Sequence, residues 1–118
     1  MHYGSQEDVA FLQSINNTNQ DFFDVIIDDG GHKMKQQITS FTYLLEKVRS
    51  GGLYIIEDLQ TSYFNEPDSG YLVNSTTIEL IKRLVDDIQS DSPRKSTPFG
   101  NYIFSFDISN KICFFNKK

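Results

Sequence analysis

The chain has a single cysteine, no tryptophan and three prolines in 118 residues. One cysteine excludes an internal disulfide and a zinc site built from several thiolates. Cys113 lies in a short apolar run, where a buried and unreactive thiol is expected. We therefore look for function among other side chains.

Positive charge is also scarce. Lys and Arg number 11 against 16 Asp and Glu, which gives a formal net charge of -5. Such a domain offers no basic surface to nucleic acid or to an anionic membrane. No apolar run reaches membrane-spanning length, and the N-terminus lacks the pattern of a signal peptide. We expect a cytoplasmic protein that binds neither nucleic acid nor membrane, and whose acidic residues could hold a metal ion where they converge.

Apolar residues follow the periods of buried strands and of an amphipathic helix. Dense apolar runs at 22–27 and 53–56 predict two strands buried on both faces of a parallel sheet. Between them, apolar residues three or four positions apart predict a helix over 34–48. We expect it to end with Arg49 in its last turn and with Gly51-Gly52 in left-handed conformations. Strand, helix and strand then form a right-handed βαβ unit.

Two further helices are expected. Residues 6–15 predict one before the first strand. The other begins at Thr76, where Thr76 and Glu79 can form a capping box, and continues through Val85 to Ile88.

The chain closes with a predicted antiparallel hairpin, formed by strands at 102–106 and 112–115 around a turn at 107–110. The turn-rich stretches 65–70 and 90–100 are interpreted as loops over one core. The predicted order is therefore α-β-α-β-α-β-β.

Acidic residues follow both parallel strands where each one ends. Asp28 and Asp29 follow the first strand, and Glu57 and Asp58 follow the second. The carboxyl ends of neighbouring strands lie about 5 Å apart, and carboxylates that close repel each other unless a cation joins them. Oxygen ligands of this kind suit Mg²⁺, Mn²⁺ or Ca²⁺. On spacing alone, an equally good interpretation is that the acids cap helix N-termini and face water.

His32 lies three residues after Asp29 and could act as a general base, since its unperturbed pKa of about 6.5 suits proton abstraction at neutral pH. For a lone histidine, a place on the surface or at the helix start is the favoured interpretation. Tyr63 and Phe64 follow the second acidic pair, and they fit a substrate pocket or an aromatic hinge packed on the core. No G-x-G-x-x-G motif, P-loop or nucleophile elbow occurs.

Two segments together resemble a known family. Residues 23–32 read Phe-Asp-Val-Ile-Ile-Asp-Asp-Gly-Gly-His, and residues 51–63 read Gly-Gly-Leu-Tyr-Ile-Ile-Glu-Asp-Leu-Gln-Thr-Ser-Tyr. Both are similar, in register, to the metal-dependent S-adenosylmethionine (SAM) O-methyltransferases that act on macrolide sugars, of the mycinamicin and tylosin type. Residues 4–12 resemble the segment just after that family's third strand. The resemblance covers most of the chain and is strongest over 22–64.

The resemblance implies SAM-dependent methyl transfer assisted by Mg²⁺ or Mn²⁺. The metal ligands that it implies are Asp29, Glu57 and Asp58. It also implies that His32 deprotonates the hydroxyl of a small-molecule acceptor, such as a sugar. The residues that it places beside the cofactor are Ser5, Gln6 and Asp28.

The implied fold is an α/β, partial Rossmann-like class I methyltransferase sheet. The family strand order 3-2-1-4-5-7-6 is reduced to 4-5-7-6, with a C-terminal antiparallel hairpin. The family's glycine-rich turn and ribose-binding acid have no counterpart in this sequence. We therefore expect residues 1–118 to form a single truncated domain that lacks the N-terminal cofactor half. Its uncovered first strand predicts a homo-oligomer or pairing with the missing N-terminal segment.

Three functions fit these observations. The leading one is SAM-dependent, metal-assisted O-methyl transfer by the complete parent protein, with this chain inactive alone. The second is a non-catalytic association or metal-binding module derived from a methyltransferase. The third, a metal-dependent hydrolase, is disfavoured because no motif marks a phosphate or acyl site.

Overall fold

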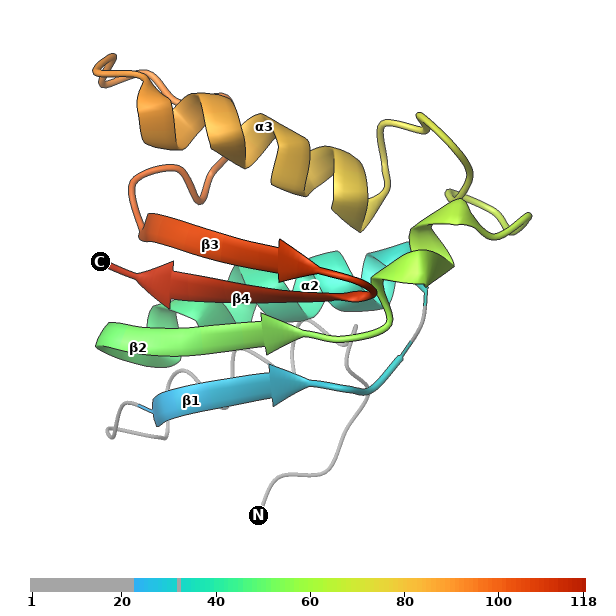
Figure 1. Ribbon diagram of the computed structural model, residues 1–118, viewed down its shortest axis with the longest axis horizontal. Coiled ribbons are helices and arrows are strands. Elements are labelled where there is room, and N and C mark those ends of the chain that lie inside the picture. Colours follow the sequence, from blue (N-terminus) through green and yellow to red (C-terminus); the bar gives the residue numbers. More distant parts are fainter. Residues whose placement is uncertain (1–22, 32) are drawn as a thin grey trace.

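The computed structural model describes residues 23–31 and 33–118. Within them, four strands form one sheet, and two helices and two short 3₁₀ turns connect these strands (Figure 1). The helix expected over residues 6–15 lies outside the described residues. The elements are, in chain order, β1 (Phe23–Asp28), α2 (Met34–Leu44), η1 (Leu45–Lys47), β2 (Val48–Ile56), η2 (Leu59–Tyr63), α3 (Thr77–Gln89), β3 (Ile103–Ser109) and β4 (Ile112–Lys117).

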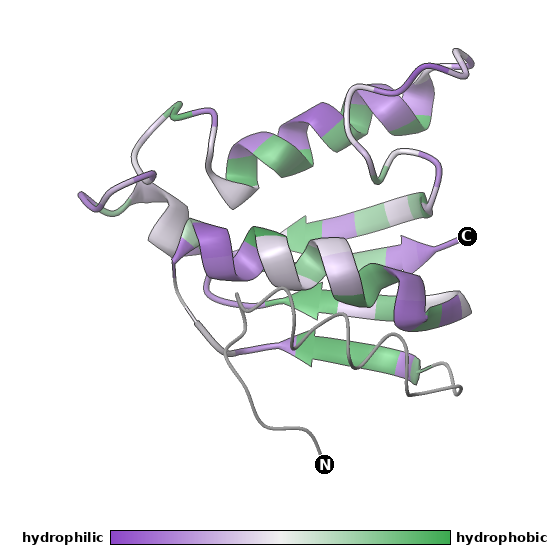
Figure 2. Ribbon diagram, turned by 180° about the vertical axis from the view of Figure 1, so that it is seen from behind, coloured by the Kyte–Doolittle hydropathy of each residue, from purple (hydrophilic) through white to green (hydrophobic). Residues whose placement is uncertain are grey.

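The sheet has the strand order β1-β2-β4-β3. β1 and β2 are parallel, whereas β4 is antiparallel to both of its neighbours, β2 and β3. α2 connects the two parallel strands and lies against one face of the sheet, and α3 runs along its β3 side (Figures 1 and 2). This arrangement confirms the predicted order 4-5-7-6 and the C-terminal hairpin.

The helix after β1 is shorter than the sequence predicted. α2 ends at Leu44, η1 follows, and Val48 already begins β2. The expectation that the helix continues through Val48 to Arg49 was therefore wrong. Arg49 instead lies in β2, where its guanidinium pairs with the carboxylate of Asp24 on β1 at 3.3 Å.

The glycines expected to end the helix form an irregularity in β2. The pairing of β1 with β2 shifts here, so that four residues of β2 lie opposite one residue of β1. Gly51 has a φ of +83°, which confirms the expected left-handed conformation. Gly52 is needed for a different reason, because a Cβ there would lie 2.6 Å from the carbonyl oxygen of Asp24. A bulge and a helix C-terminus share the same glycine signature.

The core lies between the helices and one face of the sheet, and aromatic rings form its centre. Phe41 on α2 stacks on Tyr54 and Phe99, with ring centroids 4.9 and 4.8 Å apart, and contacts Phe115 at 4.8 Å. All four side chains are buried. Large rings bury much apolar area per residue, which suits a chain of this size.

α3 begins where the sequence predicted, and of its predicted apolar stripe Ile81 is buried, with Ile78 and Ile88 packed against the core, but Val85 is not. The Oγ1 atom of Thr76 accepts a hydrogen bond from the backbone N–H of Glu79 at 3.2 Å. Leu80 and Leu84 are buried in the core, whereas Val85 is 47% exposed. Val85 lies about 100° around the helix from Leu84, on the side that faces away from the core.

The hairpin turn is also shifted from its predicted place. Asp107 lies within β3 and pairs with Phe114, so the turn falls at positions 110–111 instead of 107–110. Lys111 takes a φ of +69° in this turn. Cys113 is buried in β4, as the sequence predicted, and burial raises the pKa of its thiol to about 12, which disfavours the reactive thiolate.

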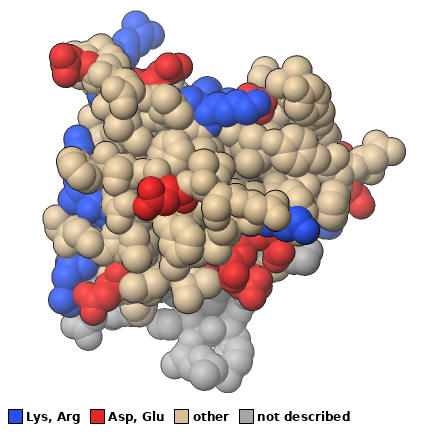
Figure 3. Space-filling model, viewed as in Figure 1, with Lys and Arg blue, Asp and Glu red and all other residues tan. Residues whose placement is uncertain are grey.

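The second face of the sheet, turned to the viewer in Figure 1, carries no helix among the described residues. Val25 and Ile27 on β1 are 47% and 61% exposed. Figure 2 shows β1 as hydrophobic over most of its length, and Figure 3 shows this face as largely uncharged. In the part of the chain that the structure describes, no helix has the length and apolar composition needed to cross a membrane.

Candidate functional site

The carboxyl ends of β1 and β2 lie side by side. Asp28 pairs with Ile56, and the N–H of Glu57 donates to the carbonyl oxygen of Asp28 at 3.0 Å, which continues the ladder beyond the end of β2. The structure therefore brings the two acidic segments to one edge of the sheet, as parallel strands require. Acidic groups gather beside these strand ends in Figure 3.

The carboxylates at this edge act on one another. The charge of Asp29 raises the pKa of Glu57, and partial desolvation, the charge of Asp58 and a hydrogen bond to Asp29 raise it further. A raised pKa at a carboxyl group that is only partly buried indicates like-charge crowding. Among the residues that the structure describes, no three His, Cys, Asp or Glu side chains are assembled around one point as metal ligands. Asp29 and Glu57 are paired, and the charge of Asp58 acts on Glu57.

Asp58 has an unusual backbone conformation. Its φ of 59° and ψ of 39° place it in the left-handed region, which Asp tolerates better than most residues. The backbone N–H and the hydroxyl of Thr61 donate to its carbonyl oxygen at 3.2 and 2.9 Å. The side-chain amide of Gln60 donates to its Oδ1 atom at 3.4 Å. Strained conformations of this kind are often retained at functional sites.

Asp28 has a different environment from its neighbour Asp29. It is 8% exposed, and its Oδ1 atom accepts a hydrogen bond from the N–H of Gly30 at 3.4 Å. Burial raises the pKa of Tyr54 well above its ordinary value, and the negative charge of Asp28 adds to that shift. A cavity of about 330 Å³ adjoins Asp28, Asp29, Ser40 and Tyr54. The two adjacent acids are therefore suited to different roles.

A larger cavity of about 580 Å³ lies between the first turn of α2 and the loop that follows η2. Phe64 lines this cavity, which agrees with the interpretation that placed it in a pocket. Tyr63 stacks on Tyr71 instead, with ring centroids 6.3 Å apart. The sequence did not single out Lys33, which lines the same cavity, because only the helix period marked that segment.

Three predicted site residues, Ser5, Gln6 and His32, lie outside the described residues. Their roles beside the cofactor and as the base therefore stay predictions. The structure does describe the residues on either side of His32. Gly31 is partly buried, and Lys33 precedes the first residue of α2.

No family model matches the chain. The curated 8-demethyl-8-(2-methoxy-alpha-L-rhamnosyl)-tetracenomycin-C 3'-O-methyltransferase of Streptomyces olivaceus is 37% identical over 101 residues, which cover 80% of this chain and 26% of that protein. The demethylmacrocin O-methyltransferase of Streptomyces fradiae is 36% identical over 104 residues, which cover 80% and 26%. The mycinamicin VI 2''-O-methyltransferase of Micromonospora griseorubida is 34% identical over 122 residues, which cover 97% and 30%.

The solved structures agree with these relatives. The MycE methyltransferase of the mycinamycin biosynthetic pathway, in complex with Mg and SAH, superposes with a TM-score of 0.81 at 34% identity. The match covers 97% of this chain and 31% of that one. The fold is that of a class I methyltransferase.

The relatives of this chain are the O-methyltransferases of macrolide and related sugars, as the paired motifs predicted. SAM and Mg²⁺ are the cofactors of these relatives. The chain spans about a quarter to a third of the length of the proteins that it matches.

Proposed function

We propose that this chain forms the metal-binding part of a SAM-dependent, divalent-metal-assisted O-methyltransferase. Its acceptor is the hydroxyl of a small molecule, and the names of the relatives favour a sugar hydroxyl. One observation carries the proposal: the ends of two parallel strands bring Asp29 and Glu57 together, with Asp58 next in the chain, and the charges of Asp29 and Asp58 raise the pKa of Glu57. Like charges brought this close suit a site for a cation.

The residues present fit Mg²⁺ or Mn²⁺. Both ions prefer carboxylate oxygens, and the chain offers three carboxylates at one edge of the sheet. Asp29, Glu57 and Asp58 would hold the ion. A bound divalent ion supplies the positive charge that makes an acceptor hydroxyl more acidic.

His32 would take the proton from this hydroxyl, and its place three residues after Asp29 suits that role. SAM, when bound, would supply the methyl group for transfer to this oxygen. Ser5, Gln6 and Asp28 belong to the cofactor side of this proposal.

We take residues 1–118 as one domain that lacks the glycine-rich half of the fold. It follows that the chain alone should not transfer methyl groups and should bind SAM no better than millimolar. We place the protein in the cytoplasm, without nucleic acid or membrane partners.

A second candidate function is that of an association module. The observation that favours it is the exposure of Val25 and Ile27 on β1, which is the outermost strand of the described sheet. Such an edge invites pairing with another strand, either from a second copy or from a separate N-terminal segment. Micromolar SAM binding in calorimetry would argue for an enzyme that is complete in itself, whereas a dimer without SAM binding would favour the module.

The metal site is tested by thermal unfolding of the whole chain with and without MnCl₂. An ion that binds only the native state at tenfold excess over its Kd stabilises it by about 1.4 kcal/mol, so the Tm should rise. Asp29→Ala and Glu57→Ala should abolish this rise. Glu46→Ala is the matched control, since it removes an exposed carboxylate on η1 outside the strand-end cluster and should leave the rise intact. An unchanged Tm for the unmodified chain at millimolar ion contradicts the proposal.

A further inference from the structure

Side chains from two other elements cap the start of α3. The first amides of a helix have no acceptor within the helix itself. The N–H of Thr77 donates to the sulfur of Met34 on α2 at 3.3 Å, and the N–H of Ile78 donates to the hydroxyl oxygen of Ser62 on η2 at 3.4 Å. The Ser62 hydroxyl in turn donates to the same sulfur at 3.4 Å. One thioether therefore joins the starts of α2 and α3 to η2.

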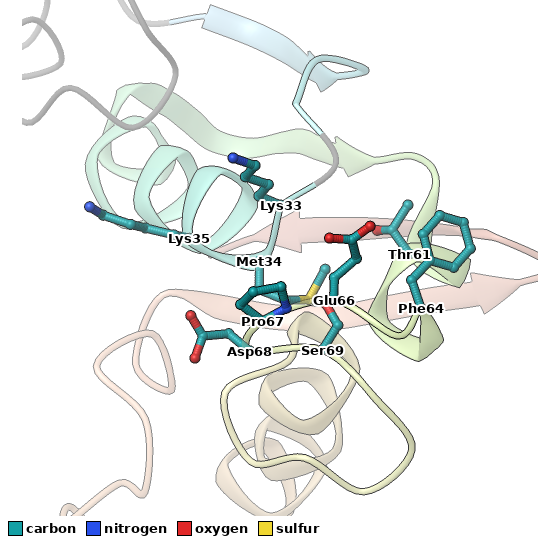
Figure 4. A pocket seen from close by; sticks show the side chains of 9 residues that line it. All are labelled: Lys33, Met34, Lys35, Thr61, Phe64, Glu66, Pro67, Asp68 and Ser69. Atoms are coloured by element: carbon teal, nitrogen blue, oxygen red, sulfur yellow. The ribbon is translucent and has the colours of Figure 1, made fainter.

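This junction is closed to water. Met34, Ser62 and Thr77 are 2%, 1% and 0% exposed. Figure 4 shows the Met34 side chain, with its sulfur in yellow, directed from the start of α2 toward the segment that follows η2. The Thr77 hydroxyl lies 3.6 Å from the sulfur, but it donates its single proton to Oε1 of Gln37 at 2.7 Å. The sulfur is thus the acceptor for the Thr77 N–H and the Ser62 hydroxyl, and a buried donor that loses its acceptor is costly.

The junction holds the segment that carries Asp58. Ser62 belongs to η2, the turn that directly follows Asp58. In the same turn, Thr61 donates its N–H and its hydroxyl to the Asp58 carbonyl oxygen at 3.2 and 2.9 Å. Asp58 has a φ of 59°, and a left-handed residue other than glycine persists only where the surrounding structure fixes it. η2 supplies these contacts to Asp58, and Met34 fixes η2 from outside.

The sulfur joins the two acidic segments at a place that the sheet does not reach. The backbone ladder between them ends at Glu57, whose N–H donates to the carbonyl oxygen of Asp28, and Asp58 lies beyond it. Met34 begins α2 five residues after Asp29. A tie from Met34 to η2 therefore fixes Asp58 relative to the segment that carries Asp29.

We propose that Met34 is a positioning residue for Asp58. Its sulfur holds η2 against the start of α2, and η2 keeps Asp58 in its left-handed conformation next to Glu57. The inference rests on the proposed function for the role of Asp58 as a metal ligand, while the effect of Met34 on the backbone of Asp58 requires no metal ion.

The test exchanges the sulfur for a CH₂ group, by production of the whole chain with norleucine in place of its two methionines, Met1 and Met34. The Mn²⁺ affinity, measured by EPR of the free ion well below the Tm, should fall about tenfold, as is typical when the support of a metal ligand is lost. The amide and Cα shifts of Asp58 in the metal-free chain should change as well. Selenomethionine, which keeps an acceptor atom with lone pairs at this place, should restore both.

Two controls separate positioning from general stability. Met34→Leu produced with norleucine and with methionine differs only at Met1, so the two samples should bind Mn²⁺ alike, and a difference would assign the norleucine effect to Met1 and overturn the inference. Ile81→Val removes a methyl group from a side chain on α3 that is 3% exposed. It should lower the Tm but leave the Mn²⁺ affinity unchanged, and an equal loss of affinity in this variant also overturns the inference.

The two readouts distinguish this inference from the proposed function. If the unmodified chain and the norleucine chain bind Mn²⁺ equally well, the inference fails while the proposed metal site stands. If the unmodified chain does not bind Mn²⁺, the proposed function fails and the shifts of the metal-free chain decide. A change at Asp58 then supports positioning by Met34, and changes confined to Ser62 and Thr77 overturn it.

Discussion

The surroundings of two carboxylates in this chain shift their pKa values in opposite directions. Asp87 on α3 is 4% exposed, and burial alone would raise its pKa. Hydrogen bonds from Ser96 and Thr97 outweigh burial, so its pKa is lowered. Glu57 is only partly buried, yet its pKa is raised, first of all by the charge of Asp29. For both acids, the neighbouring groups decide the direction of the pKa shift more than burial does.

The difference separates a structural acid from a candidate functional one. Oδ1 of Asp87 accepts from the N–H and hydroxyl of Ser96 at 2.7 and 2.9 Å, and Oδ2 accepts from those of Thr97 at 2.9 and 2.6 Å. The chain thus supplies every partner that this carboxylate needs, and the loop before β3 is fixed to α3 as a result. Glu57 is paired with a group of its own charge. A like charge nearby disfavours the ionised form of Glu57, and a bound cation would reverse that effect.

The largest expected effect comes from removing the charge of the structural acid, Asp87. Asp87→Asn should lower the free energy of unfolding by about 3 kcal/mol at pH 7, because hydrogen bonds to a buried charge are lost or weakened. The pKa of Asp87 is lowered from 3.8, so its contribution is present above that value and is lost as the pH falls through the native pKa. The difference between the two proteins should therefore shrink below about pH 4. Denaturant unfolding at pH 7 and pH 3 measures it, and a difference independent of pH contradicts this account.

A smaller loss of stability should follow when the Asp87 carboxylate is displaced without being removed. A Cβ on Gly100 would lie 2.6 Å from Oδ2 of Asp87 and 2.8 Å from its Cγ, so Gly100→Ala should cost about 2 kcal/mol. Thermal unfolding of the single and double variants measures this cost. Combined with Asp87→Ala, the loss should be less than additive, because the clash partner is gone.

Gly51→Ala is the control for backbone strain in this comparison. Gly51 has a φ of +83°, but a Cβ there meets no atom within 4 Å. Its cost of about 1 kcal/mol should add fully to that of Asp87→Ala. Full additivity at Gly100 as well would show that contact with Asp87 is not the cause.

The sequence predicted the strand-end acids better than it predicted Asp87. Parallel strands must bring their carboxyl ends to one edge, so the spacing of Asp29 and Glu57 was sufficient to place them together. The partners of Asp87 lie in the turn-rich stretch 90–100, and no local pattern links such a loop to one position on α3. The resemblance to methyltransferases implied a set of metal ligands but gave no sign of this anchor.

Helix and strand ends were the least predictable part of the fold. The apolar period of α2 runs on to Val48, but that residue pairs with Phe23 at the start of β2. Gly51 marked a local break correctly, although the break is a bulge in a strand. The hydrogen bonds to the Met34 sulfur could not be predicted for a similar reason. Met34 fits the apolar stripe of α2, and only tertiary structure brings the Ser62 and Thr77 donors to its sulfur.

The smallest expected effect concerns Glu57, the second acid of the comparison. Glu57→Gln removes one of the crowded charges and should raise the stability of the metal-free chain slightly. Because the pKa of Glu57 is raised from 4.5, the repulsion is absent below that value and is fully present only above the native pKa. The gain should therefore be seen at pH 7 and vanish near pH 4. Saturating Mn²⁺ should reverse the order at pH 7, because the unmodified chain gains the binding free energy of the ion and the variant does not. Tm measurements of both proteins and of Glu46→Gln, with and without the ion, test each step. A loss of stability in the metal-free Gln variant at pH 7 would show that Glu57 has a structural partner, like Asp87, and that its crowding does not mark a metal site.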